Sequence, residues 1–505
     1  MAPSPPLPTS TPRRELPPDH PVRRMQRPSF RIALLLSTPF VLLALALWGT
    51  IGWLLTRPPR VVASIAFVAA WVLYVCIPHI PVRLLDWPLV LSLGVIVGAL
   101  LPGDKKTWVA HTVPVAVLFV YSVVRVSVTS TAAGTEKHIV NALAVLCCVV
   151  PAWIAVSNLR LWVPADAKEL ERLEKKVYDQ YIVSEFSLLK VAGLGTVHVP
   201  YCGDSARLPP RNLVLVHGYM AGNGFWSANL QTLAKSFNVY AVEWKGIGRS
   251  DRPRFRPKNE QEMDDFFVES LEDWRRELQI PNELDVVQLD SFILCGHSMG
   301  AMYTTYYSEK YTQHIEHLIL VSPAGVNSSG LKNEDLNFFF KYASQLYITP
   351  MSVIRFAGPL GLRLVQWAMR NRIEWTPPTN IIRSGELDFD LITGYSYHNW
   401  ALDASGDIAL YTHLHPGASA RRRPLDGILV PGKIKVPLTI MYGGGPDWMN
   451  SEYGQAVIKR LESSHYAKFR LVPLSGHQVF MDNPTDFNSV LIDAVHEEER
   501  SGFPQ

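Results

Sequence analysis

The chain is 505 residues long, which is too long for one compact hydrophobic core, so we expect at least two regions. Its formal net charge of +3 is nearly balanced for this length, and no stretch interleaves basic with aromatic residues, which argues against a nucleic-acid-binding protein. The five cysteines are isolated or lie in apolar runs, a pattern that indicates neither a disulfide framework nor a cysteine metal site.

The first 31 residues are rich in proline and arginine and carry few apolar side chains. Such a segment cannot bury a core, so we interpret residues 1–31 as a disordered tail. The abundance of arginine leaves a mitochondrial presequence as an alternative, but the repeated prolines would break the amphipathic helix that a presequence needs.

Apolar runs dominate residues 32–160. The first run is long enough to cross the ~30 Å hydrocarbon core of a bilayer, and it is too long for the apolar part of a cleaved signal peptide. Successive runs are joined by short loops that carry Arg or Lys, so we predict an all-α transmembrane region of four or five helices. The apolar runs are 33–55, 61–77, 87–101, 108–124 and 139–156.

Positive charge is spread over the tail and over all the loops of this region, so it does not fix an orientation in the membrane. Apart from His111, which we assign to the interface, no ionisable residue sits deep in a run, and the sequence therefore does not indicate a transporter. A charged, helix-prone segment follows, and we predict a linker helix within 161–183, with the solvated face that is usual for charged runs.

Two strand-like runs then end in short glycine-containing turns. The run at 212–216 leads into HGYMAG at 217–222, a turn whose backbone N–H groups can face an oxyanion. The run at 239–244 leads into GIGRSDRP at 246–253.

The stretch SFILCGHSMGAMY at 291–303 has the organisation of a nucleophile elbow, with a buried strand, a tight turn around Ser298 and a helix. Gly296 and Gly300 flank the serine because a Cβ at either position would collide with the neighbouring strand or helix. A bare G-x-S-x-G pattern is common by chance, so the surrounding motifs have to decide whether it marks a catalytic serine.

In order, these motifs resemble the α/β-hydrolase superfamily, from roughly Glu185 to the C-terminus. The stretches at 357–362, 397–400 and 476–482 are similar to a lipid-acting branch of it. That branch holds the comparative-gene-identification lipase coactivator, N-acyl-phospholipid lysophospholipases and the yeast cardiolipin deacylase. The coactivator type carries asparagine at the nucleophile position, whereas this chain has Ser298, and a multi-span amino-terminal region is not part of the family's pattern.

The resemblance implies an α/β-hydrolase fold, a mostly parallel eight-stranded sheet with a helical cap. We expect the core at 184–325 and 437–505, with the cap at 326–436, since a structureless insertion of that length is implausible. The apolar runs of the cap, among them 338–340, 351–356 and 360–369, interleave with arginines. That mixture suits a lid over an acyl chain with cations near a phosphate, although ordinary amphipathic helix packing explains any single arginine equally well.

The family's order of nucleophile, acid and histidine assigns the two remaining catalytic side chains. Asp447 follows the strand-like run at 438–442, and His477 follows the run at 469–474. For the oxyanion we expect the backbone N–H groups of Met299 and Tyr219 as donors.

The other polar residues of the motifs receive supporting roles. We interpret His217 and His297 as structural residues that bond to the loops around them. Asp482 lies in an H-x-x-x-x-D spacing that resembles an acyltransferase signature, but His477 is already assigned, so we prefer a structural or second-shell role for Asp482. No cluster at ligand spacing indicates a metal, and we expect no cofactor.

The sequence therefore predicts a membrane-anchored serine hydrolase that deacylates phospholipids, lysophospholipids or N-acyl phospholipids through an acyl-serine intermediate. Its partner would be a membrane lipid, in an intracellular membrane of the endoplasmic reticulum or mitochondria. A lysophospholipid acyltransferase and a non-enzymatic lipid-binding lipase coactivator stay open as alternatives, and the oligomeric state is not indicated.

Overall fold

The computed structural model describes most of the chain after residue 162. The described residues are 163–203, 210–255, 257, 259–281, 286–328, 348–415 and 418–502. They fall within one of the chain's two compact units, Ile154–Gln505. The predicted tail at 1–31, the predicted spans within 33–156 and the cap run at 338–340 lie outside the described residues. Within the described part, no helix has both the length and the apolar character needed to cross a membrane.

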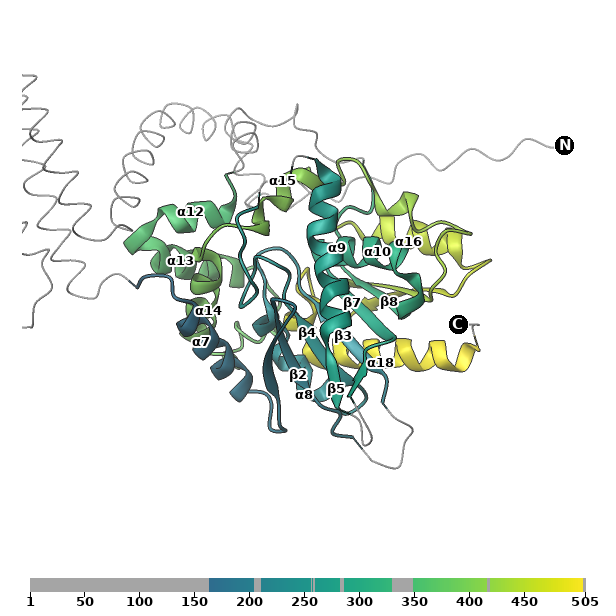
Figure 1. Cartoon of the computed structure of the whole chain (residues 1–505), viewed down its shortest axis with the longest axis horizontal. Helices are drawn as coiled ribbons and strands as arrows, with labels where there is room; N and C mark the ends of the chain where they lie inside the picture. Colours follow the sequence, from purple (N-terminus) through teal and green to yellow (C-terminus); the bar gives the residue numbers. More distant parts are fainter. Residues whose placement is uncertain are drawn as a thin grey trace, which may run out of the picture. The chain divides into compact units, whose positions relative to one another are not determined.

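A mostly parallel sheet of eight strands forms the centre of this unit (Figure 1). The strand order is β1-β2-β4-β3-β7-β8-β9-β10, in which β2 is antiparallel to both its neighbours and all other pairs are parallel. The strands are β1 (Ser187–Val191), β2 (Leu194–Val199), β3 (Asn212–Val216), β4 (Asn238–Val242), β7 (Phe292–His297), β8 (Ile315–Val321), β9 (Leu438–Gly443) and β10 (Ala467–Val472). The predicted mostly parallel, eight-stranded sheet is confirmed.

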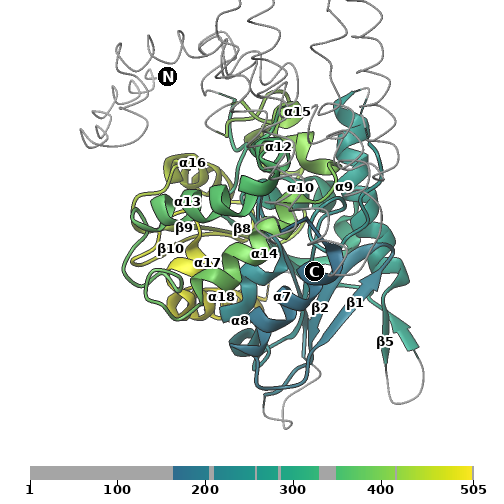
Figure 2. The ribbon, with the colours of Figure 1, turned by 90° about the vertical axis from the view of Figure 1, so that its left-hand side faces the viewer.

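Helices cover both faces of the sheet (Figures 1 and 2). Helices α8 (Ser227–Leu233) and α18 (Pro484–Ser501) pack together on one face, and α9 (Glu260–Glu277) and α10 (Met299–Lys310) pack together on the other. Every residue of β7 is buried as a result, which explains why this strand reads as a continuous apolar run rather than an alternating one.

The insertion between β8 and β9 is helical where it is described. It contains α12 (Pro350–Phe356), α13 (Gly361–Ile373), α14 (Phe389–Ala401) and α15 (Ala409–His413), and α14 packs against both α12 and α13. Arg355 of α12 pairs with Asp407 at 2.8 Å and donates to the carbonyl of Leu402 at 2.6 Å. Arg355 therefore stabilises the packing within the cap, as the packing interpretation predicts. Its guanidinium is already paired and is not free to bind a phosphate.

Helix α7 (Ala167–Asp179) lies within the predicted linker segment. The side chain of Asp166 caps it by accepting hydrogen bonds from the N–H groups of Lys168 and Glu169. Helix α7 packs against α14, and Glu174 on its inner face is fully buried. The expectation of a solvated charged face therefore holds for only one side of this helix. On the other side, the charged residue Glu174 is buried and pairs with a cation from elsewhere in the sequence.

Candidate active site

Ser298 stands on a strained corner between β7 and α10. Its φ of 55° lies in the left-handed region, which a non-glycine residue adopts only where its surroundings enforce it. A Cβ on Gly300 would lie 2.4 Å from the carbonyl oxygen of His217, and one on Gly296 would lie 2.5 Å from Oγ1 of Thr304. Glycine is therefore required on both sides of the serine.

The structure brings Ser298, His477 and Asp447 together, although they come from loops after three different strands. Nε2 of His477 lies 3.1 Å from Oγ of Ser298, and Nδ1 of His477 lies 3.0 Å from Oδ1 of Asp447. Asp447 also accepts hydrogen bonds from the hydroxyl of Ser322 at 2.7 Å and from the N–H of Met449 at 2.9 Å. These bonds fix the carboxylate so that it orients the imidazole.

Ser322 is a partner of Asp447 that no sequence motif indicated. It follows β8 directly, so the parallel order of the sheet carries it to the same edge as the loops that hold Ser298 and Asp447. The available signal was its position one residue beyond a buried strand, which is where functional side chains of parallel sheets gather.

The turn at Gly218 and Tyr219 lies directly against the serine. A Cβ on Gly218 would lie 2.9 Å from Cβ of Ser298 and 2.8 Å from Nδ1 of His297. Met299 is the first residue of α10, where backbone N–H groups have no partner within the helix and carry its partial positive charge. Both predicted oxyanion donors thus belong to segments that border Ser298.

Side chains of α14 hold this turn from the cap side. Nδ2 of Asn399 donates to the carbonyl of Ala221 at 3.0 Å, and Nε1 of Trp400 donates to the carbonyl of Met220 at 2.9 Å. Oδ1 of Asn399 accepts from the N–H of Gly248 at 2.8 Å. The sequence YHNW at 397–400 therefore fastens the cap to two loops of the core.

His217 and His297 are both buried, and each bonds to a loop. Nδ1 of His217 donates to the carbonyl of Gly218 at 2.8 Å, and its Nε2 accepts from the N–H of Trp244 at 3.3 Å. Nε2 of His297 donates to the carbonyl of His477 at 2.9 Å. Burial lowers the pKa of His217 to about 4 and holds the pKa of His297 well below its usual value, so both imidazoles are neutral near pH 7.

Asp482 links the cap to the loop that carries His477. One carboxylate oxygen accepts from Nδ2 of Asn380 at 2.7 Å, and the other accepts from the N–H of Gly476 at 2.8 Å. Burial raises the pKa of Asp482, and these two hydrogen bonds oppose the shift. Both oxygens are thus engaged away from the imidazole of His477.

The structure also contains a buried charge cluster that no sequence motif indicated. Nε of Arg249, from the GIGRSDRP motif, bonds to Glu174 of α7 at 2.5 Å, and its backbone N–H bonds to Glu243 at 2.6 Å. Both carboxyl groups are fully buried. Burial, followed by the nearby charge of Glu174, raises the pKa of Glu243 to about 8, so Glu243 is mostly protonated near pH 7.

Replacing Glu243 with glutamine is expected to flatten the dependence of stability on pH. The folded protein keeps a proton on Glu243 that the unfolded chain releases near its usual pKa of 4.5, so this residue's contribution to stability falls as pH rises from about 4.5 through about 8. Glutamine resembles the protonated side chain and does not titrate. Thermal unfolding midpoints measured between about pH 4.5 and 8 test this prediction, with the exposed Glu277→Gln as control. If the midpoint of Glu243→Gln depends on pH as steeply as that of the wild type, the raised pKa of Glu243 is contradicted.

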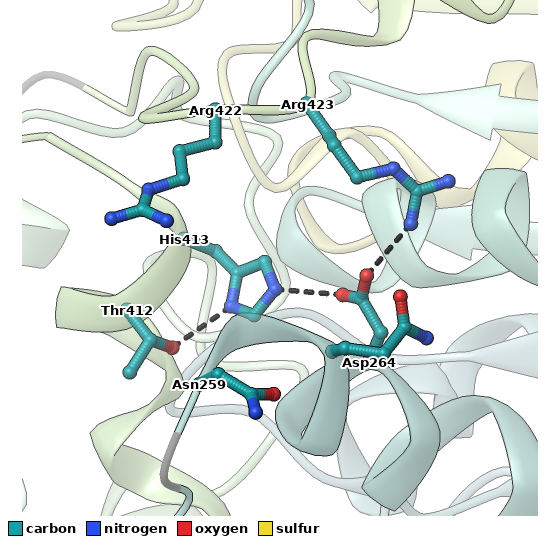
Figure 3. Close-up of a pocket in the computed structure, with 7 residues that line it drawn as sticks. Asn259, Asp264, Thr412, His413, Arg422 and Arg423 are labelled. Carbon is teal, nitrogen blue, oxygen red and sulfur yellow. Dashed lines mark hydrogen bonds and ion pairs between the residues drawn. The ribbon is translucent and has the colours of Figure 1, made fainter.

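A separate polar cavity of about 260 Å³ lies between the start of α9 and α15, and Ser298, Asp447 and His477 do not line it (Figure 3). His413 crosses it, with Nε2 at 2.7 Å from Asp264 and Nδ1 at 2.8 Å from the hydroxyl of Thr412. Arg423 donates to the second oxygen of Asp264 at 2.7 Å. Both imidazole nitrogens of His413 therefore have partners within this cluster.

The described part of the chain contains His, Cys, Asp and Glu side chains, the types that bind metal ions. Among those residues, no group of three or more His, Cys, Asp or Glu side chains is arranged to hold a metal ion. Ser298 is 8% exposed, so the residue is nearly buried.

Comparisons with known proteins identify the family of this chain. A sequence model described as alpha/beta hydrolase fold matches residues 211–484. An Arabidopsis thaliana protein named 1-acylglycerol-3-phosphate O-acyltransferase is 35% identical over 293 residues, which cover 55% of this chain and 65% of that protein. A Homo sapiens protein named (Lyso)-N-acylphosphatidylethanolamine lipase is 32% identical over 333 residues, covering 65% and 89%. A Mus musculus protein named 1-acylglycerol-3-phosphate O-acyltransferase ABHD5 is 32% identical over 291 residues, covering 56% and 77%.

Proposed function

Since the chain belongs to the α/β-hydrolase family, we propose that it is a membrane-anchored serine hydrolase that deacylates phospholipids, lysophospholipids or N-acyl phospholipids. The observation that carries the proposal is the continuous hydrogen-bonded path from Oγ of Ser298 through the imidazole of His477 to Asp447, with distances of 3.1 and 3.0 Å. The names of its relatives support a lipid substrate.

The reaction runs through an acyl-enzyme. Oγ of Ser298 attacks the acyl carbonyl and gives its proton to Nε2 of His477, while Asp447 stabilises the imidazolium that forms. The N–H groups of Met299 and Tyr219 bind the oxyanion. The imidazolium then protonates the departing lipid oxygen, and the C–O bond of the ester breaks. Water, deprotonated by His477, attacks the acyl-serine and releases a fatty acid.

Membrane anchoring is the second part of the proposal. The apolar runs within 33–156 would hold the catalytic domain beside its substrate, which raises the effective concentration of two-tailed lipids at the site. Nothing in the site calls for a cofactor, because the nucleophile, the base and the oxyanion donors all come from the chain itself.

Acyl transfer to a lysophospholipid is the second candidate, and the acyltransferase names of two relatives favour it. A transferase could use the same acyl-serine with a lysolipid hydroxyl in place of water. It could instead work through His477 and Asp482 alone. Both oxygens of Asp482 bond to Asn380 and Gly476, which speaks against that second route.

The two routes predict opposite results for Asp482→Asn. Under the acyl-serine mechanism this change weakens one supporting hydrogen bond of the His477 loop and costs about 1–3 kcal/mol of stability, with activity reduced far less than by Ser298→Ala. Labelled phospholipid offered with and without unlabelled lysolipid acceptor separates fatty acid from transferred product. Transfer that is abolished in Asp482→Asn and retained in Ser298→Ala would overturn the serine mechanism, and failure of a fluorophosphonate probe to label the wild-type chain would favour a non-enzymatic coactivator.

A further inference from the structure

Large apolar side chains remain exposed along one stretch of the cap. We call this set the cap face; it consists of Val353, Phe356, Leu360, Trp367 and Trp375. Trp367 is 63% exposed and Leu360 is 55% exposed, values that are unusual for side chains of this size and kind. Several large apolar side chains left exposed on one segment are a feature of sites that contact a protein, a ligand or a membrane.

Helices α12 and α13 each have an apolar side that their own packing does not use. Met351 and Ile354 of α12 are buried, while Val353 and Phe356 on the other side of the same helix are exposed. In α13, Val365 and Met369 are buried and Trp367 points away from them. An ordinary amphipathic surface helix would place polar residues on that outer side, so the cap face is an additional apolar surface.

The cap face continues to the rim of the candidate active site. The guanidinium of Arg372, at the end of α13, lies 5.6 Å from the ring centre of Trp448, and the Trp448 ring lies 5.0 Å from that of His477. Trp448 is 69% exposed and Leu474, three residues before the histidine, is 67% exposed. Two exposed apolar side chains thus lie near His477, and Arg372 of α13 contacts one of them.

Two features of the chain indicate what covers this face. The exposed side of α13 also carries Arg363 and Arg370, cations that suit the phosphates of a lipid surface. In addition, the described chain begins on the cap itself, since the carbonyl of Val163 accepts from the hydroxyl of Tyr397 and the N–H of Asp166 donates to His398 at 3.1 Å, both residues being in α14.

The connection to the predicted spans is short. The last apolar run ends at 156, and a fully extended chain from there to Val163 reaches at most about 25 Å, at roughly 3.6 Å per residue. Helix α14 packs against both α12 and α13, which carry most of the cap face (Figure 2). A bilayer that holds the spans is therefore within reach of this part of the cap.

We propose that the cap face inserts into the interfacial layer of the lipid bilayer and delivers the acyl chain to Ser298 along Trp448 and Leu474, without passage through bulk water. Aromatic residues suit this layer because their large rings prefer the boundary between headgroups and acyl chains. The inference deepens the proposed function, on which it rests for the identity of the substrate; the contact between cap face and lipid does not depend on catalysis.

The first test compares two substrates on the full chain reconstituted in phosphatidylcholine vesicles that contain phosphatidylglycerol. Phe356→Ser/Trp367→Ser is expected to lower hydrolysis of the bilayer lipid by about tenfold or more, while hydrolysis of soluble p-nitrophenyl butyrate stays within about twofold. The matched control, Tyr453→Ser/Leu471→Ser, replaces two exposed apolar side chains of α16 (Ser451–Leu461) and β10 and should change neither rate. Equal losses on both substrates, or no loss on the bilayer lipid, overturn the proposal.

The second test does not use activity. A phospholipid with a photoactivatable group on its acyl chain is expected to label peptides within 353–375 in wild-type vesicles, and the labelling is expected to fall by about half or more in Phe356→Ser/Trp367→Ser. A second copy or a partner protein on the cap face would exclude the probe, so absence of label on these peptides overturns the inference. A wild-type chain that is labelled there but hydrolyses neither substrate would refute the proposed function alone.

Discussion

Replacing Ser298 with alanine is expected to lower kcat/KM for ester hydrolysis by on the order of 10⁴- to 10⁶-fold, because the acyl group then has no side chain to attach to. Alanine lacks the hydroxyl that lies 3.1 Å from Nε2 of His477 and keeps the Cβ, so the elbow itself is preserved. Turnover of a soluble short-chain ester by the purified full chain measures the effect, and intact-mass detection of an acyl adduct on the wild type identifies the intermediate.

A serine on the same helix provides the control. Ser308 of α10 is buried, and its hydroxyl donates to the carbonyl of Thr305 at 2.9 Å, so Ser308→Ala removes a comparable group away from the site. Ser308→Ala should hydrolyse the ester at nearly the wild-type rate and react with a fluorophosphonate probe. Full activity in Ser298→Ala would eliminate the acyl-serine mechanism.

Replacing Arg249 with methionine is expected to lower the free energy of unfolding by about 3–5 kcal/mol, because Glu174 would stay buried without its cation. The guanidinium also donates to the carbonyls of Leu189 at 3.1 Å and Thr196 at 2.9 Å, and both would lose a donor. Fluorescence-detected thermal unfolding should show a midpoint lowered by on the order of 5–10 °C.

Two further variants isolate the cause. Arg276→Met removes an exposed arginine whose pairing distance to Asp273 is 3.8 Å, and it should change stability by less than about 1 kcal/mol. Adding Glu174→Gln to Arg249→Met should recover part of the loss, since the unpaired buried charge is then gone. A midpoint for Arg249→Met equal to that of Arg276→Met would show that the cluster does not stabilise the fold.

Local steric rules made the elbow predictable. The need for glycine at 296 and 300 follows from the tight strand-to-helix turn, and the close contacts to Thr304 and His217 are those that such a turn creates. The central strands could also be predicted from the sequence, because a strand that is buried on both faces gives an unbroken apolar run. The choice of Asp447 and His477 as partners of Ser298 came from the order of these residue types in the family that the chain resembles, and their catalytic roles stay a prediction.

Tertiary partners made other features unpredictable. Glu174 looks like one more charge in a solvated helix, and only the fold brings Arg249, 75 positions further along the chain, against it. The roles of Ser322 and Asn380 likewise depend on loops that meet across the sheet edge. Apolar runs in the cap predicted α12 and α13, but the sequence did not indicate which of their apolar side chains would be exposed.

The cap is commonly pictured in such folds as a removable cover, and helix α14 argues against that picture here. Asn399 and Trp400 donate hydrogen bonds to the carbonyls of Ala221 and Met220, two consecutive residues directly after Tyr219, so hinging α14 outward would also loosen the turn that carries Tyr219. A truncated chain that lacks the insertion is therefore expected to lose the support of this turn rather than to gain a more open site.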